Sequence, residues 1–135
     1  MKRIILFLFI TSTLFAEEYK INLKINNISK NKGNIYIKIF NSKKNYKKDI
    51  PLKQLILPSN NNEISKEIIL PNDYYLFSIF QDINNNQKLD TNFLGIPKEP
   101  VGLSNYNGKG IPGGFDKLKI YIESNNTIKI NLKKI

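Results

Sequence analysis

One segment of the sequence places oxygen-bearing side chains at the spacing of a calcium-binding loop. If Asp82 is position 1, side-chain oxygens follow at positions 3, 5 and 9, on Asn84, Asn86 and Asp90. Position 7 is Lys88, and in an EF-hand-type loop this position offers its backbone carbonyl. Short oxygen side chains at alternate positions of a curled backbone can point at one hard cation. The spacing therefore predicts a calcium site formed by these five residues.

The segment departs from the EF-hand pattern at two positions. Position 6 is Gln87 where glycine is usual, and position 12 is Phe93 where a bidentate glutamate is usual. Two carboxylates hold calcium weakly, so a third is expected from Asp73, Glu99 or Asp116, and we assign Glu99 to the site. The alternative is an asparagine-rich turn whose side chains hydrogen-bond to the backbone without a metal.

The composition excludes several kinds of catalysis. The chain has no His and no Cys, which removes the commonest general base, thiol nucleophiles and cysteine-based zinc sites. Ser104 therefore has no histidine partner for nucleophilic catalysis. We expect a protein without enzyme activity. The less favoured alternative is a hydrolase in which Asp82, Asp90, Glu99 and Asp116 converge in a cleft.

Aromatic residues in the same part of the chain suggest a second kind of site. Phe93, Tyr106 and Phe115 lie in a stretch rich in Asn, Gly and Pro, residues 82–115. Clustered near the loops, they would form an exposed patch for a carbohydrate or another small molecule of the cell envelope. The alternative is that these side chains pack in the core.

A possible modification site lies near the C-terminus. Asn125 occupies the acceptor position of an acidic-x-Asn-x-Ser/Thr sequence, residues 123–127, of the kind used by bacterial N-glycosylation systems. It falls at an expected hairpin turn between two strands. The alternative is a chance match, since the chain contains 20 asparagines.

The first 16 residues have the layout of a secretory signal peptide. Met1 to Arg3 carry positive charge, the run from Ile4 to Ile10 is apolar, and Ala16 precedes two glutamates. The apolar run is shorter than the roughly 20 residues that span a bilayer, so an uncleaved anchor is the less favoured alternative. We expect residues 17–135 to be exported, to the periplasm or outside the cell, with no membrane-spanning segment left.

The positive charge is spread along the chain and does not form one basic surface. The formal charge is +10, and it falls to +8 without the predicted signal peptide. Lysines such as Lys24, Lys38 and Lys129 alternate with apolar residues, as on the solvated face of a strand. We therefore expect no nucleic-acid partner. An envelope protein or a glycan remains the expected partner, and the oligomeric state is left open.

Alternation of apolar and polar residues predicts strands through most of the remaining chain. The clearest examples are residues 20–25, 35–40, 64–70, 117–122 and 128–132. Tyr74–Phe80 is apolar at nearly every position, which predicts a central strand covered on both faces. Leu52–Leu57 fits either a short helix or an edge strand. Short strands separated by turn residues favour a β-sandwich or an open barrel.

Three stretches of the sequence resemble a bacterial protein family: Leu70–Tyr75, Phe80–Pro100 and Gly102–Asn105. They are similar to the family called domain of unknown function 2141, and the likeness extends from about residue 33 to residue 132. The resemblance implies a small, exported all-β protein with a prealbumin-like sandwich, and it carries no assigned activity. This chain has Gln81 where the family has histidine, which argues against a metal or acid–base role there.

These observations together predict one domain of the all-β class over residues 17–135. We expect a single antiparallel β-sandwich, prealbumin-like or immunoglobulin-like, with about seven strands. A long ordered loop over residues 82–115 would carry the calcium site and the aromatic patch, because connections of that length are usually functional.

Overall fold

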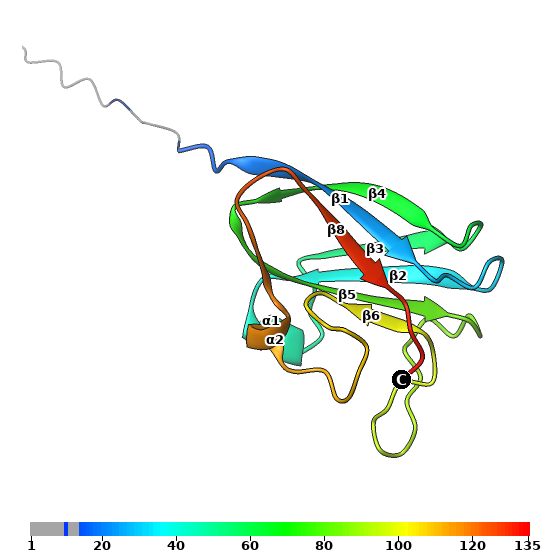
Figure 1. Ribbon diagram of the computed structural model, residues 1–135. Helices are drawn as coiled ribbons and strands as arrows, with labels where there is room; N and C mark the ends of the chain where they lie inside the picture. The colour runs from blue at the N-terminus through cyan, green and yellow to red at the C-terminus, as the bar shows by residue number, and fades with distance from the viewer. Residues whose placement is uncertain (1–9, 11–13) are drawn as a thin grey trace, which may run out of the picture.

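The computed structural model of the protein describes residue 10 and residues 14–135. Within that part of the chain it has eight strands and two short helices (Figure 1). The strands are β1 (Glu18–Asn26), β2 (Asn34–Phe40), β3 (Lys53–Pro58), β4 (Ile64–Pro71), β5 (Asp73–Asp82), β6 (Val101–Leu103), β7 (Ile120–Ile122) and β8 (Asn126–Asn131). The helices are α1 (Lys43–Lys47) and α2 (Phe115–Leu118).

The strands form two sheets, which confirms the all-β class. One sheet has the order β4-β1-β8, and the other has the order β3-β2-β5-β6 with β7 paired to the start of β5. The described chain has eight strands, close to the expected number of about seven, but the expectation of an antiparallel fold was wrong for β1 and β8, which pair in parallel. The reason is that β7 and β8 belong to different sheets, so the turn between them is not a hairpin.

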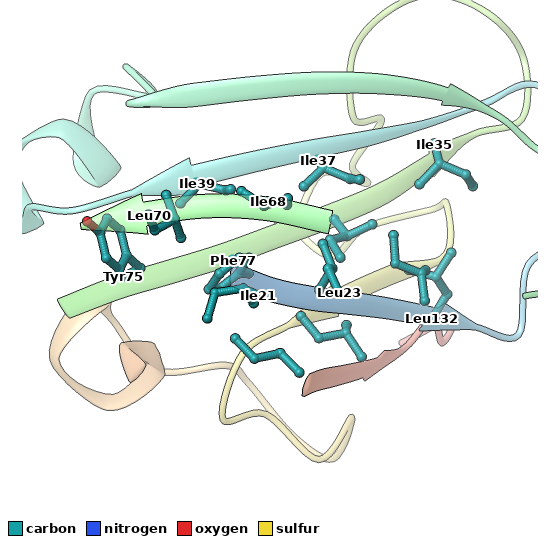
Figure 2. Close-up of a cluster of buried hydrophobic side chains, with 14 of the residues drawn as sticks. Ile21, Leu23, Ile35, Ile37, Ile39, Ile68, Leu70, Tyr75, Phe77 and Leu132 are labelled. Carbon is teal, nitrogen blue, oxygen red and sulfur yellow. The ribbon is translucent and has the colours of Figure 1, made fainter. Parts of the chain in front are cut away.

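Alternate side chains from both sheets form one hydrophobic core between them (Figure 2). Ile21, Leu23 and Ile25 of β1 are fully buried in this cluster, and they share it with three isoleucines of β2. The polar residues between them point away from the core, as the period of two requires. The alternation thus identified the inward faces of β1 and β2 correctly. The strand predicted over residues 117–122 was too long, because residues 117 and 118 belong to α2.

Strand β5 is covered on both faces, as the sequence predicted. Three of its residues belong to the main core: Tyr75, Phe77 and Ile79. On the opposite face, Leu76 packs in a second cluster with the buried residues of α2. Phe80 stacks on Tyr36 of β2, with ring centroids 4.9 Å apart. β5 is therefore a rigid central strand, and the candidate calcium loop begins at its last residue.

The predicted loop over residues 82–115 is two connections and not one. Strand β6 interrupts it and pairs with the second half of β5. Val101 and Gly102 are buried, and a Cβ on Gly102 would lie 2.5 Å from the Cγ2 of Ile130. A three-residue strand is too short to show alternation, so the sequence did not reveal it. Leu52–Leu57 resolves as the edge strand β3.

The predicted signal peptide, residues 1–16, lies mostly outside the described residues. Of its described residues, Ile10, Leu14 and Phe15 are at least 84% exposed and belong to no strand. Every described strand and every described core residue lies within residues 17–135. Across residue 10 and residues 14–135, no helix is both long enough and apolar enough to cross a bilayer.

Candidate functional site

The loop after β5 is wound around the carboxylate of Asp82. This side chain is 1% exposed, and its two oxygens accept hydrogen bonds from the backbone N–H groups of Asn86 (3.2 Å) and Gln87 (2.8 Å). Asn85 and Gln87 have left-handed backbone conformations, with φ of 57° and 66°. Such conformations are uncommon for residues with a side chain. The Asp82 carboxylate therefore holds a tight turn that Gln87 adopts in place of the usual glycine.

Two residues that the sequence analysis did not assign to the site hold Asp82 in position. Gly33 has φ +61°, and a Cβ there would lie 1.7 Å from the carbonyl oxygen of Asp82. Gln81 is fully buried; its side chain accepts from Ser29 N and donates to the carbonyls of Ser29 and Lys32. These contacts bind the β1–β2 connection to the end of β5. In the sequence, Gly33 lies among the turn residues Asn31–Asn34. No neighbouring residue indicates that this turn contacts Asp82.

The exposed side of the loop is organised by Asp90. Its carboxylate accepts hydrogen bonds from the side-chain amides of Asn84 (2.6 Å) and Asn86 (2.8 Å). These two bonds lower the pKa of the Asp90 carboxyl below its ordinary value, because they favour the charged form. The structure therefore brings together the four side chains predicted at positions 1, 3, 5 and 9.

Glu99 joins this loop, whereas the other two candidate carboxylates do not. It is 5% exposed, and its oxygens accept from the backbone N–H groups of Ile83 (2.9 Å) and Asp90 (3.3 Å). Asp73 instead accepts from the adjacent Tyr74 N, and Asp116 pairs with Lys43 and Lys119 near the helices. Glu99 thus ties the two ends of residues 83–90 together.

Oxygen-bearing side chains surround the loop, but they do not form a complete coordination shell for a metal ion. Within the described residues, no three Asp, Glu, His or Cys side chains form a group that could hold a metal by themselves. The amides of Asn84 and Asn86 now direct nitrogen at Asp90. A half-turn of each amide about χ2 would point its oxygen, and not its nitrogen, toward the space beside the Asp90 carboxylate. A surface cavity of about 370 Å³ lies here, lined in part by Asn84, Asp90 and Glu99. A cation at this position would need two asparagine oxygens and the Lys88 carbonyl.

The predicted aromatic patch of Phe93, Tyr106 and Phe115 is not formed. Phe115 is 6% exposed and packs in the second core cluster, because α2 turns it toward β5. Tyr106 is half-buried against the same cluster, and its hydroxyl donates to the Gly110 carbonyl (2.6 Å). Phe93 is 95% exposed at the end of the other loop. The sequence placed all three in one stretch, but it could not show that α2 buries one of them.

A larger cavity of about 540 Å³ lies between β6 and the end of β8. Its lining includes Tyr106, the lysines Lys129 and Lys133, and four asparagines: Asn27, Asn105, Asn107 and Asn131. It is therefore polar and basic, with one aromatic side chain. The sequence analysis missed this site because its residues come from three segments that are far apart in the chain.

Asn125 lies in the exposed turn between β7 and β8. Its side-chain oxygen accepts a hydrogen bond from Lys20 N at 2.9 Å. The turn joins the two sheets and is not the hairpin that was expected. The residue nevertheless remains on the surface, as an acceptor for a large modification must be.

Comparison with known proteins gives a family but no activity. A family model described as "Uncharacterized protein conserved in bacteria (DUF2141)" matches residues 23–130, which is most of the chain. No curated protein and no solved structure matches the chain. The function must therefore be argued from the site.

Proposed function

The chain belongs to the DUF2141 family of bacterial proteins, and from its site we propose an exported, non-enzymatic module whose Asp82 loop is stabilised by calcium. The observation that carries this proposal is that Asp82, Asp90 and Glu99 all accept hydrogen bonds within one short loop that also holds Asn84 and Asn86. The two facing sheets with a shared core further support a sandwich of the prealbumin or immunoglobulin type.

The chemistry of these groups suits a hard cation. Calcium takes six to eight oxygen ligands, including carboxylates, amide oxygens and backbone carbonyls. Three carboxylates would supply a formal charge of −3 around the loop, and Glu99 would supply the acid that is missing at position 12. Asp82 is already held on one side of the loop by backbone bonds. Calcium would thus replace the amide–carboxylate bonds on the exposed side with stronger contacts.

Thermal unfolding with and without calcium tests this proposal. Extracellular calcium modules bind with Kd of about 0.1–1 mM. At about 5 mM calcium, such a site would add about 1–2.3 kcal/mol to the free energy of unfolding. We expect the melting temperature to rise with calcium and to rise less with magnesium, which demands a tighter octahedral geometry.

Matched variants assign the response to the loop. Asp90→Asn and Glu99→Gln each remove one carboxylate charge from the site and should abolish most of the calcium shift. Asp116→Asn removes a carboxylate charge near the helices and should retain the full shift. The absence of any shift in the wild-type protein at about 5 mM calcium would refute the proposal. An equal shift in all three variants would refute the assignment to this loop.

Export is supported by where the folded unit begins. β1 starts at Glu18, and the backbone carbonyl of Glu17 already accepts a bond from Asn72 N (3.1 Å). Cleavage after Ala16 would remove the exposed residues Ile10, Leu14 and Phe15 and leave every described strand intact. Mass spectrometry of the protein recovered from the periplasm or medium of an expressing bacterium should show a chain that starts at Glu17. A full-length chain confined to the cytoplasm would contradict export.

The cavity between β6 and β8 favours a second candidate function, the binding of a small acidic saccharide. Asparagine amides can both donate to and accept from hydroxyl groups, and lysines can pair with a carboxylate. Tyr106 offers the single aromatic contact. Calorimetric titration with glucuronic acid and with glucose tests this function. Binding of glucuronic acid that is lost in Lys133→Gln would support it, and equal heats for both sugars would refute it.

A further inference from the structure

The most exposed apolar residues of the connection 83–100 lie at its tip. Phe93 is 95% exposed and Leu94 is 68% exposed, with Leu89 and Ile96 each at 37%. The yellow-green connection extends away from the two sheets in Figure 1. Four exposed large apolar side chains within eight residues indicate an interaction site. We propose that this tip, residues 91–97, inserts Phe93 and Leu94 into the surface of an anionic phospholipid bilayer.

Four backbone N–H groups of the tip are hydrogen-bonded within the chain. It is a small hairpin, closed by a bridge between Thr91 and Pro97. Asn92 N donates to the Ile96 carbonyl (2.9 Å), and Gly95 N donates to the Asn92 carbonyl (3.0 Å). The side-chain oxygen of Asn92 accepts from both Leu94 N (2.8 Å) and Ile96 N (3.0 Å). Backbone groups that enter the apolar part of a bilayer must find partners within the protein, and these bonds provide partners for the N–H groups of Asn92, Leu94, Gly95 and Ile96.

The charge around the tip complements an anionic surface. Lys88 and Lys98 are exposed on either side of the apolar residues, and in the described part of the chain neither forms an ion pair. Asp90 lies close to both lysines, but its carboxylate is occupied by two asparagine amides. Long cationic side chains beside an inserted apolar group can reach lipid headgroups. The formal charge of +8 without residues 1–16 acts in the same direction.

The shape of this feature favours a bilayer over a protein partner. The two most exposed side chains stand on a protruding turn, and Phe93 at 95% exposure touches almost nothing of its own chain. A protein partner would need a pocket shaped to receive this turn. A bilayer surface accepts a protruding apolar turn without one. The proposal does not require calcium, so it can be tested in the presence of EDTA.

Vesicle sedimentation of residues 17–135 in EDTA gives the first test. We expect binding to vesicles of equal phosphatidylglycerol and phosphatidylcholine, and weaker binding to phosphatidylcholine alone. Phe93→Ser with Leu94→Ser should lower the partition coefficient about tenfold or more. Lys88→Gln and Lys98→Gln should each lower it about fivefold on the anionic vesicles. Ile50→Ser is the matched control, because Ile50 is 54% exposed near α1, beyond the other end of β5.

The absence of tryptophan from the chain allows a second test that does not depend on affinity alone. Phe93→Trp should shift its emission to shorter wavelength on anionic vesicles, and brominated lipid should quench it. Ile50→Trp should show neither change. Unaltered emission of Phe93→Trp on saturating vesicles would overturn the proposal. Self-association in solution that disappears in Phe93→Ser, with no vesicle binding, would also overturn it in favour of a contact between copies of this chain.

Discussion

Removal of the Glu99 carboxylate should destabilise the fold by an amount that can be worked out from its two contacts. Hydrogen bonds to a charged group are worth about 1.5–3 kcal/mol each. The bond from Ile83 N is short at 2.9 Å, and the bond from Asp90 N is long at 3.3 Å, so the second lies at or below the lower end. Because the carboxylate is 5% exposed, solvent screening reduces these values little. We expect Glu99→Ala to lower the free energy of unfolding by about 2–4 kcal/mol.

Urea denaturation in EDTA measures this loss without a contribution from calcium. For a typical urea m-value of about 2 kcal/mol/M, the midpoint should fall by about 1–2 M with the slope unchanged. Glu99→Gln keeps one acceptor oxygen and should lose about half as much. Glu67→Ala removes an exposed glutamate of β4 and should change stability by less than about 0.5 kcal/mol. If Glu99→Ala and Glu67→Ala lower the free energy of unfolding by the same amount, Glu99 does not tie the loop together.

Two further substitutions test the Asp82 loop and its surroundings, one tests the buried Ser104 hydroxyl between β5 and α2, and one tests modification. Gly33→Ala should cost about 2–5 kcal/mol, since it adds left-handed strain and a collision with the Asp82 carbonyl; a loss below about 1 kcal/mol in denaturation would contradict the close approach. Because the pKa of Asp90 is lowered in the folded state, its contribution is present above about pH 4 and is lost as the pH falls. Asp90→Asn should therefore flatten the acid end of a stability–pH curve, and identical curves would refute this. Ser104→Ala should cost about 1–3 kcal/mol in the same denaturation assay, because the buried hydroxyl bridges two backbone groups; a neutral result would show that water replaces it. If Asn125 is glycosylated, the intact mass of the protein from its native host should exceed the mass calculated from the sequence. Asn125→Gln should then remove this difference.

Much of the fold could be predicted from local patterns. The period of two in residues 20–25 and 35–40 placed Ile21, Leu23 and the isoleucines of β2 in the core, where they lie. The apolar run Tyr74–Phe80 identified a strand that is covered on both faces. The motif between residues 82 and 105 indicated the family to which the chain belongs. These features are local because side-chain direction along a strand depends only on position along the backbone.

The pairing of strands was not contained in those patterns. Nothing in the alternation of β8 shows that it runs parallel to β1, or that β7 adds to the opposite sheet. Alternation specifies which face of a strand is buried and leaves its neighbour open. β6 escaped notice because three residues are too few to show a period, although it divides the connection that carries the site.

For the candidate site, the sequence determined the types of the side chains and their spacing, and the tertiary structure decided which distant groups join them. Asp82, Asn84, Asn86 and Asp90 come together because they share one short loop. Only the folded chain distinguishes Glu99 from Asp73 and Asp116, since β6 returns to β5 and carries Glu99 to Ile83 N and Asp90 N. Likewise only the packing of α2 separates the buried Phe115 from the exposed Phe93. Contacts between segments far apart in the chain depend on how the two sheets are paired, and one stretch of sequence does not record that arrangement.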